Sequence, residues 1–192
     1  MEKIIQVLLI GEPGCGKTCL ARALHEKERK IPSPTIGIDF LQTSHKYHNE
    51  TITLKTWEIS INQIAMLEGM HQEFDYIFLC TNCEVRKYHQ LMKVYRFLSL
   101  TSGRNSIFIF VGCKVDILCT LSPLEFHSFL ESLEKKTKGL SIPKILTSAE
   151  TDFFINECRN MIFDSNINKN PIRFSILKMV KEFKERNGII DN

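Results

Sequence analysis

The chain has 192 residues, of which 43% are hydrophobic and 24% charged, and its net charge is +3 at pH 7. This length suits one domain with a substantial core, and the composition is that of an ordinary globular protein. So small a net charge gives no argument for nucleic acid, and no nucleic-acid partner is expected. Apolar runs also stay well short of the ~20 residues that a membrane-spanning helix needs.

The first apolar run, residues 4–10, passes directly into a glycine-rich loop and does not resemble a signal peptide, which would end at a small-residue cleavage site. Seven cysteines, an odd number, are typical of reduced thiols in the cytosol. We therefore expect a cytoplasmic protein. Cys80 and Cys83 have CxxC spacing, but there is no second pair to complete a zinc site. Buried or incidental thiols are the preferred interpretation over a metal or redox role.

In chain order, short apolar runs alternate with helical patterns. Runs typical of strands buried on both faces lie at residues 4–10, 76–80, 106–112 and 144–146. Residues 39–57 differ, because two strand-like runs flank a polar turn and predict an antiparallel hairpin at the sheet edge. Helical patterns lie at residues 88–98 and 122–139, and the second begins with a capping box, Ser122 and Glu125. The alternation predicts an α/β fold with helices on both faces of the sheet.

The C-terminal region predicts a separate segment. Residues 165–171 are rich in asparagine and predict a linker, so we divide the chain into a domain at 1–164 and a linker with a C-terminal helix at 165–192. The helix has an apolar stripe formed by Ile172, Ile176, Met179, Val180 and Phe183. Three interpretations stay open, namely packing against the domain, docking into a partner, and lying on a membrane surface.

The loop after the first strand matches the phosphate-binding pattern G-x-x-x-x-G-K-[ST], with a strand before it and a helix after it. Glycines allow backbone N–H groups to turn inward around an anion at the start of the helix. Lys17 would reach the β- and γ-phosphates, and the Thr18 hydroxyl would bind magnesium. The residues predicted to contact the nucleotide here are Gly11, Pro13, Gly14, Cys15, Gly16, Lys17, Thr18 and Cys19.

Further motifs carry a resemblance to a family. The string TIGIDF at residues 35–40 resembles switch I of the Ras-like small GTPases, especially the Rab branch, and Trp57 stands where Rab proteins carry a tryptophan before switch II. VGCKVD at 111–116 and TSAE at 147–150 resemble the two guanine-binding motifs. The resemblance spans about residues 3–163 and implies a P-loop NTPase of Ras-like fold, with a six-stranded, mostly parallel sheet and about five flanking helices. The C-terminal helix would be an addition to this fold.

The resemblance also implies GTP or GDP and Mg²⁺ as ligands. Asp116 would accept two hydrogen bonds from guanine, the alkyl stem of Lys114 would cover the base, and the backbone at Ser148 and Ala149 would meet the guanine carbonyl. Cys113 stands in the same motif, where relatives usually carry asparagine. Thr35 would meet the γ-phosphate and the metal. The metal set implied by the family is Thr18, Thr35 and Glu58.

Switch II departs from the family pattern D-T-A-G-Q, since EISIN follows Trp57. Glu58 replaces an aspartate, Ile61 replaces a glycine whose amide meets the γ-phosphate, and Asn62 replaces the glutamine that orients water. Asn62 is one carbon too short, and Gln63 could substitute only if the loop shifted. These two are the candidate catalytic residues. Pro13 and Glu150 also depart from the pattern, so we expect nucleotide binding with slow or lost hydrolysis.

Partner surfaces are expected at switch I, at the hairpin through Phe40 and Trp57, and at the C-terminal helix. Residues 58–73 contain no aromatic residue, and their Met and Ile side chains either form a partner surface or pack inward. The last cysteine is Cys158 and residue 2 is Glu, so the sequence offers no lipid anchor of its own.

These features favour a Rab-like GTP-binding protein that acts in vesicle trafficking or as a partner-binding switch. The alternative is a non-enzymatic pseudo-GTPase that serves as a structural subunit of a cytoplasmic or ciliary assembly. An ATP-using kinase or ATPase is a weaker alternative. Such an enzyme would need another acidic or basic catalytic constellation, whereas the chain has the guanine-type motif CKVD at residues 113–116.

Overall fold

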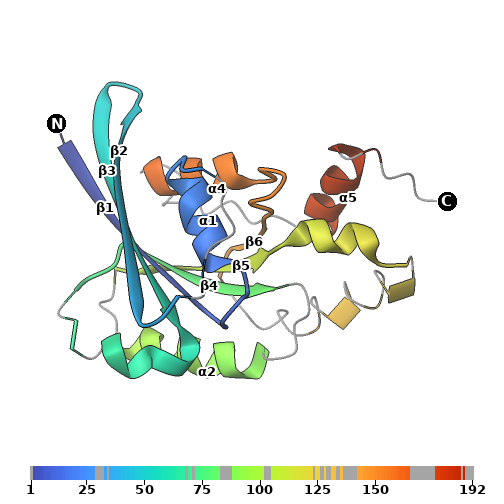
Figure 1. The fold of residues 1–192 in the computed structure, drawn as a ribbon, viewed down its shortest axis with the longest axis horizontal. Coiled ribbons are helices and arrows are strands. Elements are labelled where there is room, and N and C mark those ends of the chain that lie inside the picture. The colour runs from blue at the N-terminus through green and yellow to red at the C-terminus, as the bar shows by residue number, and fades with distance from the viewer. Residues whose placement is uncertain are drawn as a thin grey trace.

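A six-stranded sheet organises the fold, with strand order β2-β3-β1-β4-β5-β6 (Figure 1). The computed structural model describes residues 2–28, 33, 35–67, 69–70, 72–82, 88–101, 105–122, 124–125, 128, 131–132, 135, 142–164, 176–186 and 188. The strands are β1 (Glu2–Gly11), β2 (Ile38–Tyr47), β3 (Glu50–Ser60), β4 (Tyr76–Asn82), β5 (Ile107–Cys113) and β6 (Lys144–Leu146). Among the strands of the described residues, β2 with β3 is the one antiparallel pair, which confirms the predicted edge hairpin and the mostly parallel sheet.

Helices cover both faces of this sheet, as the alternation of elements predicted. They are α1 (Lys17–Leu24), α2 (Tyr88–Thr101), α4 (Ile155–Phe163) and α5 (Ile176–Arg186), with 3₁₀ helices η1 (Ile61–Leu67) and η2 (Val115–Thr120). In Figure 1, α1 and α4 lie on one face and α2 on the other, while α5 lies toward the β6 end. Across the described residues, every helix falls short of the length and apolar character that a membrane crossing needs.

The core lies along the central strands. Val7, Leu9, Phe78 and Phe110, from β1, β4 and β5, are almost completely buried. These strands have apolar residues on both faces because helices cover both sides of the sheet. The edge strand β2 instead alternates between exposed and half-buried residues, since only one of its faces packs on the domain.

Two predicted segments are described only in part. The capping box is confirmed, since the Ser122 N–H donates to Glu125 Oε2 at 3.0 Å and the Glu125 N–H donates to Ser122 Oγ at 3.4 Å. Most of the predicted helix 122–139, the predicted linker 165–171 and Ile172 lie outside the described residues. The boundary at 164/165 therefore stays a prediction.

The C-terminal helix α5 packs on the domain, which was one of its three interpretations. Met179 and Phe183 are buried, and the N–H of Leu146 in β6 donates to Met179 Sδ at 3.4 Å. At Met179 and Phe183, the apolar stripe of α5 therefore belongs to the hydrophobic core.

Candidate nucleotide-binding site

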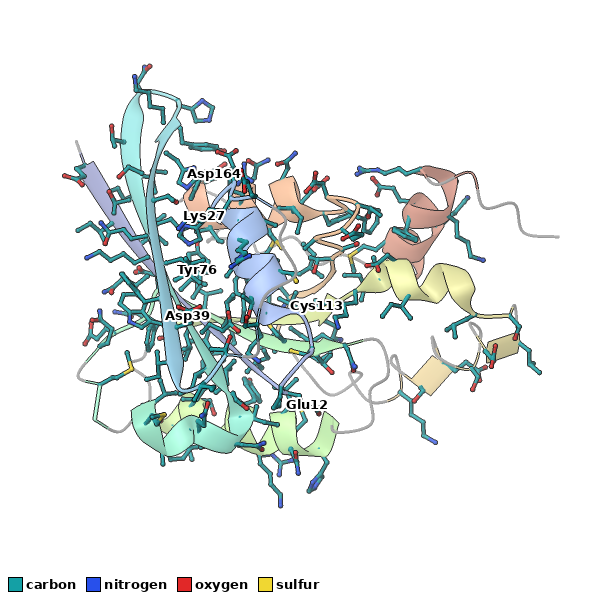
Figure 2. The ribbon with its side chains drawn as sticks, viewed as in Figure 1. Glu12, Lys27, Asp39, Tyr76, Cys113 and Asp164 are labelled. Atoms are coloured by element: carbon teal, nitrogen blue, oxygen red, sulfur yellow. The ribbon has the colours of Figure 1, made fainter. Side chains whose placement is uncertain are left out.

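The predicted site residues gather at the carboxyl ends of the parallel strands, where ligands bind in open α/β sheets. Gly11 at the end of β1 lies opposite Ser60 of β3 and Cys80 of β4, while Gly112 of β5 lies opposite Leu146 of β6. In Figure 2, Glu12 and Cys113 lie toward the start of α1, whereas Lys27 and Asp164 lie toward its other end. The carboxyl ends of β1, β4 and β5 thus lie close to the start of α1.

Lys17 is held inside the loop that precedes α1. Its ammonium group is buried and donates to the carbonyl oxygens of Gly11 at 3.2 Å and Glu12 at 2.8 Å. Gly16 has a φ of 110°, which only glycine adopts readily, and Gly14 has a φ of 74°. A side chain at Gly11 would put its Cβ 2.1 Å from the Cys80 carbonyl oxygen. The loop therefore needs its glycines and surrounds a positive charge.

The other loop side chains point in different directions. Pro13 and Gly14 are exposed, and Cys19 is half-buried on the first turn of α1. Cys15 is buried and its thiol donates to the Cys80 carbonyl at 3.7 Å, while burial raises the Cys15 pKa to about 12. The Cys15 side chain therefore stays a neutral thiol buried beneath the loop.

The three predicted metal ligands lie together. Thr18 Oγ1 donates to Glu58 Oε1 at 2.5 Å, Thr35 Oγ1 donates to the same oxygen at 3.1 Å, and the two hydroxyls are 3.2 Å apart. Glu58 is buried. Such an all-oxygen set suits Mg²⁺, which prefers oxygen ligands from one or two carboxylates together with phosphate. Within the described ranges, no cluster of three or more His, Cys, Asp or Glu side chains is placed to hold a metal ion.

The predicted base-binding residues also come together, although they lie more than 30 positions apart. Ser148 Oγ donates to Asp116 Oδ1 at 2.6 Å, and Ser148 is completely buried while Ala149 beside it is half-buried. Lys114 has a left-handed φ of 60°. Its stem runs beside Gly16, where an added Cβ would lie 3.5 Å from Lys114 Cγ. The stem is therefore close to the phosphate loop, as a base-covering residue requires.

Cys113 has a packing role that the sequence did not reveal. It is buried directly beneath the phosphate loop, where a Cβ on Gly16 would lie 3.1 Å from Cys113 Cβ. A side-chain hydrogen bond with Cys80 lowers the Cys113 pKa; burial opposes this shift, and a hydrogen bond with Thr147 adds to it. In the sequence, Cys80 has CxxC spacing with Cys83, but Cys83 lies outside the described residues. The Cys80–Cys113 contact arises from the β4–β5 pairing and has no sequence signal.

The two candidate catalytic residues, Asn62 and Gln63, differ in exposure and in their contacts. Asn62 is exposed, and its backbone N–H donates to Ser60 Oγ at 3.4 Å. The Gln63 amide faces Gly37 in the switch I backbone. The amide orientation that satisfies both groups places its nitrogen 3.1 Å from Gly37 O and its oxygen 3.2 Å from Gly37 N. No sequence pattern indicates this contact, and water orientation by either residue stays a prediction.

A row of three aromatic rings lies beside the switches. Phe40 and Trp57 pair across β2 and β3 with ring centroids 4.8 Å apart, and Phe74 packs edge-on against Trp57 at 5.6 Å. Sequence reasoning stopped at residue 73 and missed Phe74. Of the apolar residues in between, Ile59 and Ile61 are buried whereas Met66 is 48% exposed. Ile59 and Ile61 therefore pack inward, while a partner surface at the exposed Met66 stays a prediction.

Comparisons with known proteins agree with this geometry. The sequence profile of the Ras family matches residues 6–166. Ras-related protein Rab-7B of Dictyostelium discoideum is 33% identical over 122 residues, which cover 60% of each chain. Ras-related protein RabT2 of the same organism is 25% identical over 97% of this chain and 86% of its own length. Ras-related protein SEC4 of Saccharomyces cerevisiae is 22% identical over 98% of this chain and 80% of its own length.

The fold and the order of motifs therefore agree with a profile match that covers more than half of the residues. The chain belongs to the Ras family of small GTPases and is similar to its Rab-related members.

Proposed function

We propose that the protein binds GTP and GDP with Mg²⁺ and acts as a Rab-like switch whose GTP hydrolysis is slow or lost. The observation that carries the proposal is the convergence of Thr35 on Thr18 and Glu58. Thr35 belongs to the segment before β2, so its position beside α1 joins switch I to the phosphate loop. This is the arrangement that a loop ordered by a γ-phosphate requires.

At the phosphate end, the chain supplies positive charge and backbone donors. The Lys17 ammonium now bonded to two loop carbonyls is placed to interact with the β- and γ-phosphates, and the start of α1 adds the positive end of the helix dipole. Thr18 and Thr35 would hold the metal directly, with Glu58 orienting both hydroxyls. When bound, Mg²⁺ neutralises charge on the phosphates.

At the base end, Asp116 selects guanine. Its carboxylate can accept from the ring N–H and the exocyclic amine together, a pair that adenine does not offer. Ser148 bonds to Asp116 and so fixes the carboxylate in place. The amides at Ser148 and Ala149 would meet the guanine carbonyl.

Slow hydrolysis follows from switch II. Asn62 has the amide needed to orient water but lacks one carbon, and the Gln63 amide is bound to Gly37. Ile61 is buried and β-branched where a glycine would allow a close backbone approach to the γ-phosphate. A partner that supplies missing groups would accelerate the reaction. We infer a role in trafficking or partner binding in the cytoplasm, with partners at switch I and the Phe40–Trp57 surface.

The second candidate is a non-enzymatic structural subunit in which the nucleotide never cycles. The Gln63–Gly37 contact favours this alternative, because it ties switch II to switch I through protein groups alone.

The identity of the bound nucleotide separates these candidates. The purified protein is denatured, the released nucleotide is identified by chromatography, and added GTP is then followed for several hours. GDP supports turnover, intact GTP supports a switch that does not hydrolyse, and absence of nucleotide supports the structural subunit. Retained ATP would contradict the guanine assignment.

The phosphate loop has its own test. Lys17→Ala is expected to abolish nucleotide retention, because it removes the charge at the centre of the loop. Lys27→Ala is the matched control, since Lys27 is exposed near the other end of α1. Equal retention by the Lys17 variant and the control would contradict the assignment of this loop.

A further inference from the structure

Helix α5 covers the free edge of the sheet at β6. On the inner side of β6, the Thr147 N–H donates to Gly112 O at 2.7 Å. Successive N–H groups of a strand point to opposite sides, so the Leu146 N–H faces away from β5. The buried Met179 Sδ of α5 accepts from this N–H at 3.4 Å. The helix therefore bonds to the residue directly before the base-binding motif.

The same helix also packs against the turn that precedes α4, residues 152–154. Phe183 packs edge-on against Phe153 with ring centroids 4.8 Å apart. The Arg186 guanidinium lies 5.4 Å from the Phe153 ring centroid and 5.7 Å from that of Phe154. Arg186 is also paired with Glu157 of α4 at 3.6 Å. Ring packing and cation–π contacts thus connect α5 to this short turn, and an ion pair connects it to α4.

The turn needs such support because its backbone is strained. Asp152 has a φ of 55° and Phe154 a φ of 56°, in the left-handed region that non-glycine residues seldom occupy. A conformation of this kind persists when the surrounding structure determines it, as it does at many ligand-binding positions. The contacts of Phe183 and Arg186 supply part of that surrounding structure.

From the turn, hydrogen bonds lead to the base-reading carboxylate. The Ser148 N–H donates to Phe153 O at 3.2 Å, and the two residues form an antiparallel bridge. Ser148 Oγ accepts from the Thr151 N–H at 3.2 Å and donates to Asp116 Oδ1 at 2.6 Å. A continuous series of contacts therefore runs from Phe183 through Phe153 and Ser148 to Asp116.

We propose that α5 positions the guanine-binding loop, so that Phe183 and Arg186 act as positioning residues for base selection. This inference rests on the proposed guanine-nucleotide binding and adds a means of regulating it. A protein partner that displaced α5 would loosen the base-binding loop and accelerate GDP release. The contacts of Thr18 and Thr35 with Glu58 involve α1, switch I and β3, and β3 is separated from β6 by β1, β4 and β5.

The experiment uses the full chain and compares Phe183→Ala and Arg186→Ala with Lys181→Ala, an exposed position on the same helix. Affinities for GDP and ADP are measured by competition against a fluorescent GDP analogue, alongside its dissociation rate and thermal unfolding. The first two variants are expected to lower the GDP-to-ADP affinity ratio at least tenfold and to accelerate GDP dissociation. Lys181→Ala and the conservative Phe183→Leu are expected to stay near the wild-type ratio.

A purely structural role for α5 would lower the unfolding temperature without changing the affinity ratio. A ratio within twofold of wild type in both variants would therefore overturn the inference. If Phe183→Ala does not fold, Arg186→Ala decides alone, because this side chain is 48% exposed and its removal leaves the buried contacts of Met179 and Phe183 in place. Absence of GDP binding by the wild-type chain would overturn the proposed function as well, which distinguishes the two failures.

Discussion

At the scale of single residues, Glu58 illustrates how a buried charge is used. Only 4% of this residue is exposed, and removing a carboxylate from water is costly unless hydrogen bonds compensate. Thr18 and Thr35 supply two such bonds to one carboxylate oxygen. The carboxylate thereby fixes a hydroxyl from α1 and a hydroxyl from switch I at the same point.

We predict that Glu58→Gln weakens Mg²⁺ binding about 10- to 100-fold, the usual effect of removing a group that orients metal ligands. The amide keeps the shape of the side chain but loses its charge. The measurement is the Mg²⁺ concentration that halves the rate of GDP release. Glu73→Gln, at an exposed position, is the matched control. The same Mg²⁺ dependence in both variants would contradict the assigned role.

A substitution at Asn62 is expected to raise activity rather than lower it. Its amide is exposed and one carbon short of the family's glutamine. Because about 1 Å of misplacement can cost about a hundredfold in rate, Asn62→Gln is expected to raise single-turnover GTP hydrolysis, by about tenfold or more. Asn160→Gln makes the same change on the exposed side of α4 and is expected to leave the rate unaltered. If Asn62→Gln also leaves it unaltered, the missing carbon is not the cause of slow hydrolysis.

At the scale of elements, His25 joins the end of α1 to the hairpin. Its Nδ1 lies 2.6 Å from Thr43 Oγ1 of β2, and its Nε2 lies 2.8 Å from Thr56 Oγ1 of β3. Arg159 of α4 joins the same end by donating to the Ala23 carbonyl at 3.1 Å and by pairing with Glu26. These polar contacts hold four elements together at the opposite end of α1 from the nucleotide site.

His25 makes stability depend on pH. Burial, followed by the nearby His45, lowers the His25 pKa from 6.5 to about 4. Between these two values the unfolded chain binds a proton at His25 that the folded chain does not, so stability falls as the pH falls. The expected loss is about 2–3 kcal/mol between pH 6.5 and 4.5.

Urea unfolding at pH 7 and pH 4.5 measures this dependence. His25→Gln removes the titrating group and is expected to flatten the pH dependence, although it lowers stability at pH 7. His89→Gln, at an exposed position of α2, is expected to keep the wild-type dependence. An equally steep fall in the His25 variant would show that other groups cause it.

At the scale of the whole molecule, α5 completes the sheet. Strand β6 is the last strand and has only three residues, and its outward N–H at Leu146 is bonded to Met179. An uncovered strand edge is a site for pairing with another chain, and natural proteins often cover such edges with a helix. The C-terminal helix therefore packs on the same domain whose proposed nucleotide site lies at the carboxyl ends of the strands.

We predict that truncation after residue 164 lowers the unfolding temperature. Exposing the surface buried by Met179 and Phe183 costs about 1.5–3 kcal/mol for each side chain, which corresponds to a shift on the order of 5–20 °C in a chain of this size. Light scattering is expected to show self-association through the exposed β6 edge. Truncation after residue 186, which keeps α5, is the control. A monomeric 1–164 fragment with the full unfolding temperature would contradict this role.

The sequence by itself determined the local features of this protein. The loop of Gly11, Gly16, Lys17 and Thr18 was predictable because its glycines and lysine have fixed spacing between a strand and a helix. The buried strands and the hairpin were predictable from their apolar runs and alternation, and the resemblance of short motifs indicated the family. Each of these signals is contained within a few consecutive residues.

Only the tertiary structure decided which distant residues meet. The Gln63–Gly37 and Cys80–Cys113 contacts, the packing of Phe74 on Trp57 and the bond from Leu146 to Met179 of α5 join residues 17 to 33 positions apart. Such contacts depend on strand register and helix placement, which are properties of the folded chain as a whole. For that reason the sequence indicated which residues could bind a nucleotide, while the fold determined how the switches and the C-terminal helix are connected to them.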